Sequence, residues 1–280
     1  MRLLELMTSG GIAVLFGAVA TSSIRSVLPG QDLALDARRT GVVASAVILY
    51  SGDNDERFPL LQTEGSRRAS PPNHDRVWGQ LVLPYHGLME HYRDPDDPVT
   101  ETELLAGMPG CDASPIQCEF NLAYKSHRGL NYQSLSPFGS LCGSGNLHQS
   151  ISTRIDEIQS PAATLMLVDS VYDRVGGVPF GGGTHAVDPP ARYTTSGFDL
   201  LASSAPCRSR LWLGGWNPSL PGAWNRYGAV WGWHKGHATV AFIDGHTRLM
   251  SYGQLAAGAT VLDAWRGRVF DRDAYLWDRN

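Results

Sequence analysis

The stretch "HATVAFIDGHTRLMS", residues 237–251, decides the fold more clearly than any other part of the chain. Apolar side chains run along both halves, and the Asp-Gly pair between them (244–245) is typical of a tight hairpin turn. We therefore expect two antiparallel strands joined by a type I′ turn, with positive φ at both central residues. A second apolar run, "ATLMLVDS" (163–170), is bounded by turn residues and predicts another strand.

An amphipathic helix is predicted far upstream of the hairpin. Between Val43 and Tyr50, apolar residues recur at i, i+3, i+4 and i+7, the spacing of one helical face. If residues 1–50 form mostly one helix, it is about 75 Å long at about 1.5 Å per residue, and only its second half can pack on the remaining chain. The predicted fold class is α+β, with this long N-terminal helix packed on an antiparallel sheet in a β-rich head (51–280).

The composition favours a loop-rich β structure in that head. The 280 residues include 31 glycines, 17 prolines and 8 tryptophans, and only 18% of them are charged. Residues 173–234 are especially rich in glycine, proline and aromatics, so we expect a long surface insertion there and not a separate domain. The net charge of −4, without a basic block, argues against a nucleic-acid partner.

Four cysteines lack CxxC spacing, which argues against a zinc knuckle or a thioredoxin-type motif. In an exported protein, an even number of cysteines predicts two disulfides. Cys111 with Cys118 would close a short loop. Cys142 and Cys207 would then form the second bond, which is one of three connectivities. Four free, buried thiols are the alternative.

The first residues bear on where the protein resides. Nineteen uncharged residues (6–24) approach the length of about 20 that spans a bilayer. A cleaved secretory signal with Ala-Val-Ala (18–20) as its cleavage site is one interpretation, and a simple membrane anchor is another. Neither explains Glu5, because a carboxylate at the edge of an apolar helix is costly unless it is paired.

Several segments follow one another in an order that resembles a known family. They are "VLPG" (27–30), "ALDARRT" (34–40), "YSGDNDERFP" (50–59), "YRDPDDP" (92–98) and "ISTRIDEIQSPAATLMLVDS" (151–170). His234 and Asp244-Gly245 then enclose nine residues, a His-x9-Asp-Gly motif. Together they resemble the bacterial prepilin-type family of type IV pilin and pseudopilin-like proteins, which is abundant in planctomycetes and carries this C-terminal motif.

The resemblance implies a pilin-like fold and a structural, non-enzymatic role. With Met1 as the processed N-terminus, Glu5 stands at the fifth position, where the family's glutamate pairs with the α-amine of a neighbouring subunit. The implied assembly is a homo-oligomeric helical filament held by the N-terminal helices, as in a type IV pilus or a type II secretion pseudopilus. The subunit would lie in the inner membrane before assembly and in an extracellular or periplasmic filament afterwards.

Three histidines crowd the hairpin segment and raise the question of a metal site. Zinc requires three or four converging ligands, and His234, His237 and His246 could supply them in a metal-dependent hydrolase. We favour a structural role, in which His234 bonds the backbone or the Asp244 carboxylate and holds the start of the hairpin. Within the resemblance, His234, Asp244 and Gly245 form the family motif, whereas the other two histidines are not part of it.

We expect no cofactor, and calcium is the second candidate ion besides zinc. The segment "SGDNDE" (51–56) offers Asp53 and Asp55 as oxygen ligands. Because it lacks the twelve-residue EF-hand form, we favour a solvated helix C-terminus there.

Two further functions stay open besides those of a filament subunit and a metal-dependent hydrolase. A catalytic triad that includes Ser170 and His234 has no nucleophile-elbow motif in its support. A monomeric exported or membrane-anchored glycan-binding module would stack tryptophans of the 173–234 segment on sugars, although core packing explains most tryptophans better. These tryptophans are Trp212, Trp216, Trp224 and Trp231.

Overall fold

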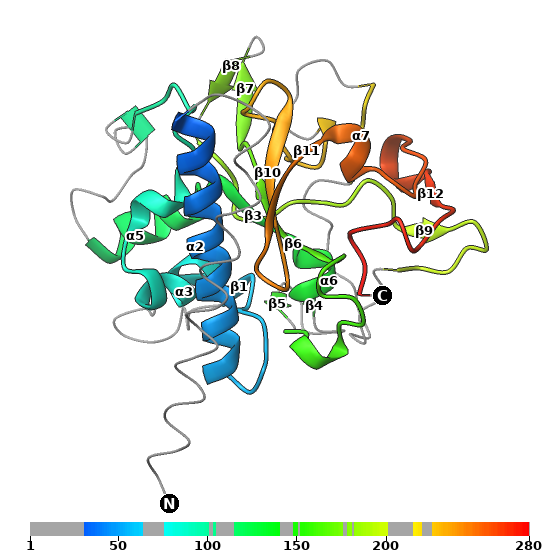
Figure 1. Ribbon diagram of the computed structural model, residues 1–280, viewed down its shortest axis with the longest axis horizontal. Helices are drawn as coiled ribbons and strands as arrows, with labels where there is room; N and C mark the ends of the chain where they lie inside the picture. The colour runs from blue at the N-terminus through cyan, green and yellow to red at the C-terminus, as the bar shows by residue number, and fades with distance from the viewer. Residues whose placement is uncertain are drawn as a thin grey trace, which may run out of the picture.

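A long helix packed on an antiparallel sheet forms the centre of the molecule (Figure 1). The computed structural model describes residues 31–63, 76–100, 103–104, 115–140, 148–150, 152–175, 178–180, 182–200, 215–219 and 226–279. The helix is α2 (Gln31–Asp53), and the sheet has the strand order β11-β10-β6-β3. Its strands are β3 (Arg128–Leu130), β6 (Leu165–Asp169), β10 (His237–Phe242) and β11 (Thr247–Ser251). The prediction of a mixed α+β fold with antiparallel sheets is confirmed.

Helix α2 presents one buried stripe to the sheet. Val43, Ala44 and Val47 are fully buried there, in agreement with the predicted helical face. One and two turns towards the N-terminus, the stripe continues through Thr40 and Asp36. These two residues are polar and yet 0% exposed. The buried face of the helix therefore includes a carboxylate.

The turn of the β10–β11 hairpin differs from the predicted type I′. Among the connecting residues 243–246, only Gly245 has a positive φ, at +89°. Its N–H donates to the Phe242 carbonyl oxygen at 2.9 Å, and the Phe242 N–H donates to the His246 carbonyl oxygen at 3.0 Å. This is a type I turn followed by a left-handed glycine, which adds a bulge before β11. Two consecutive positive φ values occur elsewhere, for example at Lys235-Gly236 (+52° and +84°), before β10.

The sheet separates two hydrophobic cores because side chains alternate along each strand. On β10, Ala241 belongs to the core beneath α2, whereas Val240 and Phe242 belong to the core on the opposite face. The C-terminal part of the chain covers this second core with Tyr275 and Trp277, which are 2% and 0% exposed. In Figure 1 this part, drawn in red, lies across the sheet from α2.

Shorter elements surround these layers. The helical ones are α3 (Trp78–His86), η1 (Met89–Tyr92), α5 (Pro115–Tyr124), α6 (Tyr132–Leu135), η2 (Ile155–Glu157), α7 (Tyr252–Leu255) and η4 (Asp263–Trp265). Three strand pairs are antiparallel: β1 (Gln62–Thr63) with β2 (Arg76–Val77), β4 (Phe138–Ser140) with β5 (His148–Ser150), and β7 (Asp173–Val175) with β8 (Val178–Phe180). One pair is parallel: β9 (Tyr193–Thr194) with β12 (Arg268–Val269). Helices α3 and η1 pack on α2, and η1 leads into the loop 93–98.

The segment expected to be a surface insertion contributes to the core instead. Within the described parts of residues 173–234, Ala186, Val187 and Val230 are at most 1% exposed, and Trp216 is 2% exposed. Their apolar side chains fill both cores. The prediction is therefore wrong for these parts, because composition does not reveal that the glycine-rich chain returns to the sheet.

Several expectations fall outside the described residues, among them those for Met1, Glu5, segment 6–24, Cys111, Cys142 and Cys207. Cys118 on α5 forms a disulfide, so the free-thiol alternative is wrong for this residue, and the predicted connectivity stays a prediction. Among the helices that the structure describes, none combines the length and the apolarity needed to cross a bilayer.

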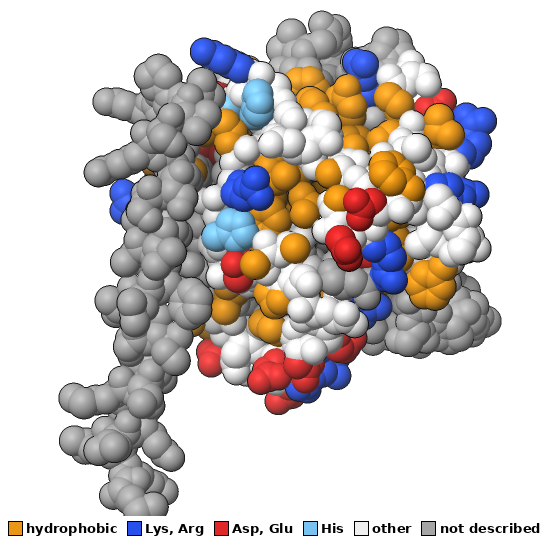
Figure 2. Space-filling view, turned by 45° about the vertical axis from the view of Figure 1, so that its right-hand side comes forward, with side chains coloured by type: hydrophobic (Ala, Val, Ile, Leu, Met, Phe, Trp, Pro, Cys, Tyr) orange, Lys and Arg blue, Asp and Glu red, His pale blue; other side chains and the backbone are white. Residues whose placement is uncertain are grey.

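One face of the molecule carries both acidic and basic side chains around a central group of apolar ones (Figure 2). On α2 itself, Leu35 and Leu49 are 39% and 50% exposed. They are 14 positions apart, which places them within about 40° of each other around the helix. Helix α2 thus exposes two leucines on one side, which they share with the exposed Arg38 and Ser45.

Candidate functional site

Neighbouring strands place charged side chains on the face of the sheet that α2 covers. Arg128 on β3 stands directly opposite Asp169 on β6. Each lies two positions from a core residue of its own strand, Leu130 or Leu167, and therefore on the same face. Both charged side chains are 0% exposed, so the guanidinium and the carboxylate meet away from water.

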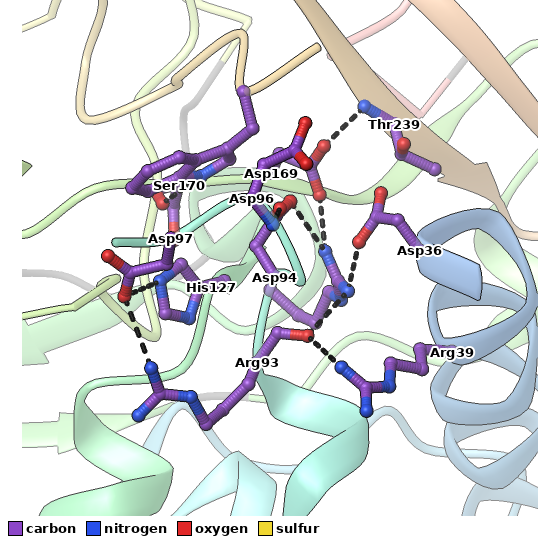
Figure 3. A network of polar contacts seen from close by, with 12 residues as sticks. Asp36, Arg39, Arg93, Asp94, Asp96, Asp97, His127, Asp169, Ser170 and Thr239 are labelled. Atoms are coloured by element: carbon purple, nitrogen blue, oxygen red, sulfur yellow. Dashed lines mark hydrogen bonds and ion pairs between the residues drawn. The ribbon is translucent and has the colours of Figure 1, made fainter. Parts of the chain in front are cut away.

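Arg128 links the sheet to the helix. Its Nη1 donates to Asp169 Oδ1, and its Nη2 donates to Asp36 Oδ1 on α2. The second Asp169 oxygen accepts the backbone N–H of Thr239 on β10. Figure 3 shows Asp36 extending from α2 and Thr239 from β10, with Asp169 and Asp94 nearby. One guanidinium and two carboxylates thus join α2 to three strands.

His234 reaches the same network from the segment before β10. Its Nε2 lies 3.0 Å from Asp36 Oδ2, and its Nδ1 lies 3.0 Å from Asp96 Oδ2. The ring is 5% exposed, whereas the side chain of Asp96 is 36% exposed. His234 therefore spans the distance between the buried carboxylates and the rim of the site.

A tight turn positions His234. The backbones of His234 and His237 exchange two hydrogen bonds of 3.1 and 3.0 Å around Lys235-Gly236. Gly232 packs against this turn so closely that an added Cβ would lie 2.4 Å from the Gly236 carbonyl carbon. The glycines of "GWHKGH" are therefore needed for the placement of the imidazole.

Asp94 brings a third carboxylate to the network. It lies in the loop 93–98 and is 2% exposed. Its Oδ1 accepts the Asp96 N–H at 2.8 Å, whereas its Oδ2 accepts no hydrogen bond. Arg128 Nη1 and His234 Nε2 each lie 3.9 Å from that oxygen. An unsatisfied buried acceptor is costly, and Asp94 Oδ2 is the one buried carboxylate oxygen of the described residues without a hydrogen-bond partner.

A neighbouring acid–histidine pair anchors the same loop. The His127 ring places Nε2 2.8 Å from Asp97 Oδ2, and both side chains are at most 1% exposed. Burial works to raise the pKa of Asp97, but the hydrogen bond and charge of His127 lower it overall. Burial is the main cause of a lowered pKa at His127. The pair holds the loop that carries Asp94 and Asp96 against β3.

Burial and mutual charge shift the pKa of each member of the network. Burial, reinforced by Asp36 and Asp169, raises the pKa of Asp94 to about 9. Burial and Asp36 also raise the pKa of Asp169, to about 7. Burial works to lower the pKa of His234, yet the carboxylates, led by Asp36, raise it to about 9. Burial works to raise the pKa of Asp36, yet Arg128 and His234 lower it well below its ordinary value.

Four of these side chains are close enough to share a cation. One ligand atom each from Asp36, Asp94, Asp169 and His234 lies within 4.8 Å of the other three. No other group of three or more such side chains converges in this way among the residues that the structure describes. Carboxylate oxygens and imidazole nitrogens are ordinary ligands of divalent metals, so the chemistry of the set suits either an ion-pair network or a cation site.

The structure separates the two ends of the His-x9-Asp-Gly motif. His234 precedes β10 and Asp244 follows it, and this strand of 6 residues is about 20 Å long. The expected bond between them is therefore wrong, and the His234 ring bonds Asp36 and Asp96 instead. Asp244 Oδ1 lies 2.6 Å from His246 Nδ1 and accepts the His246 N–H, within the β10–β11 turn.

The remaining candidate ligands lie outside the network. His237 and His246 do not belong to the converging group, so the three-histidine site does not form. Asp53 and Asp55, the calcium candidates, stand at the exposed end of α2. Asp53 Oδ2 accepts a hydrogen bond from Tyr85 at 3.0 Å, and Asp55 has a φ of +53° just beyond the helix.

Two residues that a catalytic triad or a glycan-binding surface would use are buried and bonded to the backbone. Ser170 is 0% exposed, and its hydroxyl lies within hydrogen-bond distance of the carbonyl oxygens of Ser126 and Thr184, so it forms no triad with His234. Trp216 is buried and donates Nε1–H to the Asp188 carbonyl oxygen at 2.9 Å. Trp231 is partly buried, and Trp212 and Trp224 lie outside the described residues.

Sequence reasoning misses most of this network. It assigns no role to Asp36, Arg128 or Asp169, and it uses the segment 92–98 only as part of the family resemblance. One signal is present in the sequence, because Asp36 occupies a position of the apolar stripe of α2. A charged residue at a core position of an amphipathic helix predicts a buried partner.

Comparisons of the chain with protein-family models, with curated proteins and with solved structures found no match. The pilin-like family is therefore an inference from the order of short sequence segments.

Proposed function

We propose that this chain is a structural subunit of a type IV pilus-like or type II secretion pseudopilus filament, and that it assembles through its N-terminal helix. The observation that supports this most is the packing of α2 along an antiparallel sheet, directly downstream of an apolar segment. If the apolar segment extends α2 as predicted, such a helix suits a filament, because its apolar half can be buried only by a membrane or by neighbouring subunits.

Two exposed leucines on α2 support the same proposal. Leu35 and Leu49 face away from the sheet on one side of the helix, at 39% and 50% exposure. In a filament, neighbouring helices would cover such side chains. The subunit would reside in the inner membrane before assembly and in an extracellular or periplasmic filament afterwards, as a homo-oligomer.

The buried network has a mechanical role in this proposal. Tension along a filament acts on the helices at its centre and passes to each head through the contact between α2 and the sheet. The Arg128 bonds to Asp36 and Asp169 cross that contact in a region without water. Charge-assisted hydrogen bonds of this kind resist sliding of the helix along the sheet better than apolar contacts, which have no preferred direction.

Substitution of Glu5 tests the assembly mechanism. In Glu5→Ala the carboxylate that would pair with a neighbouring α-amine is removed, so we expect loss of filament incorporation, scored by electron microscopy and by shearing of surface fractions. The head should keep the wild-type unfolding midpoint, because Glu5 precedes the part that packs on the sheet. Asp32→Ala is the matched control, since Asp32 is exposed in the first turn of α2. Normal assembly of Glu5→Ala would sink the proposal.

A further inference from the structure

We propose that Asp36, Asp94, Asp169 and His234 form a binding site for one divalent transition-metal ion, such as Zn²⁺ or Mn²⁺, between α2 and the sheet. This site goes beyond the filament role and does not depend on it. Its residues come from α2, the loop 93–98, β6 and the segment before β10. A bound ion would connect all four parts of the chain.

The convergence of ligand atoms fits a metal. Two cis ligands about 2.1 Å from an ion lie about 3.0 Å apart, and two trans ligands lie about 4.2 Å apart. Asp36 Oδ2 and His234 Nε2 are 3.0 Å apart, and Asp94 Oδ2 is 3.9 Å from the same nitrogen. The full set lies within 4.8 Å, so a closure of roughly half an ångström brings every ligand into range.

The unpaired oxygen of Asp94 is a second observation, besides the convergence of the acidic side chains. Its Oδ2 is buried, accepts no hydrogen bond and faces the other ligands. A hydrogen-bonded interior leaves few such atoms, and those that occur require an explanation such as an ion. A metal at this point would satisfy the one carboxylate oxygen of the network that the protein itself does not.

His234 has the second contact that metal-ligating histidines usually have. Its Nδ1 lies 3.0 Å from Asp96 Oδ2, so Nδ1–H can donate to that carboxylate and present Nε2 to the ion. At Asp36, Arg128 uses Oδ1 whereas His234 faces Oδ2, and at Asp169 the ion would use the second lone pair of an oxygen that also accepts from Arg128 or from the Thr239 N–H. In the metal-bound state, with His234 neutral and all three carboxylates ionised, one guanidinium leaves two negative charges, which one divalent cation balances.

The ligand set indicates the class of ion. Imidazole favours transition metals over Mg²⁺ and Ca²⁺, and carboxylates accept both Zn²⁺ and Mn²⁺. Calcium takes 6–8 oxygen ligands in proteins, more than three aspartates provide without bidentate contacts or water. We therefore expect Zn²⁺ and Mn²⁺ to bind more tightly than Ca²⁺ or Mg²⁺.

Metal binding by the full chain in detergent micelles tests the site. The protein is stripped with chelator and titrated separately with each of the four ions, with calorimetry and elemental analysis as readouts. We expect one Zn²⁺ or Mn²⁺ per chain. At a free concentration of about 100 Kd, the folded-to-unfolded ratio should rise about 100-fold. Absence of stoichiometric binding by the wild type overturns the proposal.

Variants locate the ion. Asp94→Asn keeps the shape of the side chain and should weaken binding at least tenfold, and Asp96→Asn should weaken it about 10–100-fold. Asp53→Asn is the matched control, because it alters an exposed carboxylate at the far end of α2 and should bind like the wild type. Equal affinity of Asp94→Asn and wild type overturns the assignment, and loss only in Asp53→Asn places the ion at the helix end.

A measurement on the wild type keeps the test valid if a variant fails to fold. Electron spin-echo spectroscopy of the Mn²⁺-loaded protein should detect the nitrogen of one coordinated imidazole. A spectrum without nitrogen coupling excludes His234 as a ligand and overturns the site.

Discussion

Replacement of Arg128 by methionine tests how much the buried network contributes to stability. Arg128 and its partners Asp36 and Asp169 are all 0% exposed. Methionine keeps an unbranched apolar side chain but leaves both carboxylates without their shared cation. Breaking a buried ion pair by removal of one partner costs about 3–5 kcal/mol. Because folded domains are stable by only about 5–15 kcal/mol, we expect Arg128→Met to lose a large part of its stability.

Urea unfolding in the presence of chelator, followed by tryptophan fluorescence, measures this loss. With a slope of about 3 kcal/mol per molar urea, the midpoint of Arg128→Met should fall by about 1–2 M. Arg154→Met is the control, because Arg154 and its partner Glu56 are 35% and 60% exposed and water can replace their contact. If Arg128→Met unfolds at the same urea concentration as Arg154→Met, the network contributes little and the reasoning is refuted.

Two further changes test the placement and the charge of His234. The pKa of His234 is raised to about 9, against about 6.5 in an unfolded chain, so its stabilising contribution is complete below about pH 6.5 and is lost as the pH rises through about 9. The wild type should therefore lose more stability over this interval than His234→Gln, and equal losses in urea titrations would contradict the assignment. Gly232→Ala should cost about 1–3 kcal/mol in thermal unfolding, because its Cβ would lie 2.4 Å from the Gly236 carbonyl carbon. Gly52→Ala is its control, since nothing lies within 4 Å of that added Cβ, and similar melting temperatures for the two variants would show that the turn tolerates a side chain.

Local pattern is sufficient to predict the main elements. The period of apolar residues between Val43 and Tyr50 predicts the buried face of α2, and the run ending at Asp169 predicts β6. Strand and helix formation depend mainly on near neighbours, so one sequence carries that information. The turn type is harder, because an Asp-Gly pair suits both the predicted type I′ turn and the observed type I turn with a left-handed glycine.

The glycine-rich segment shows where composition misleads. Its described parts place Val187, Trp216 and Val230 in the second core, although the sequence predicts a surface insertion. Glycine, proline and aromatic residues are frequent in loops, but they also permit a chain without regular structure to pack closely on a sheet. Composition cannot distinguish the two cases, because the difference lies in what the segment covers.

The sequence by itself determined the hairpin, the amphipathic helix and the apolar N-terminal segment, because each depends on residues a few positions apart. Only the tertiary structure decided which polar groups meet. Asp36 and His234 are 198 positions apart, and they come within 3.0 Å because α2 lies over the strand that His234 precedes. Arg128 faces Asp169 because of the register between β3 and β6. Register and helix placement result from packing of the whole core, so no local pattern reveals them.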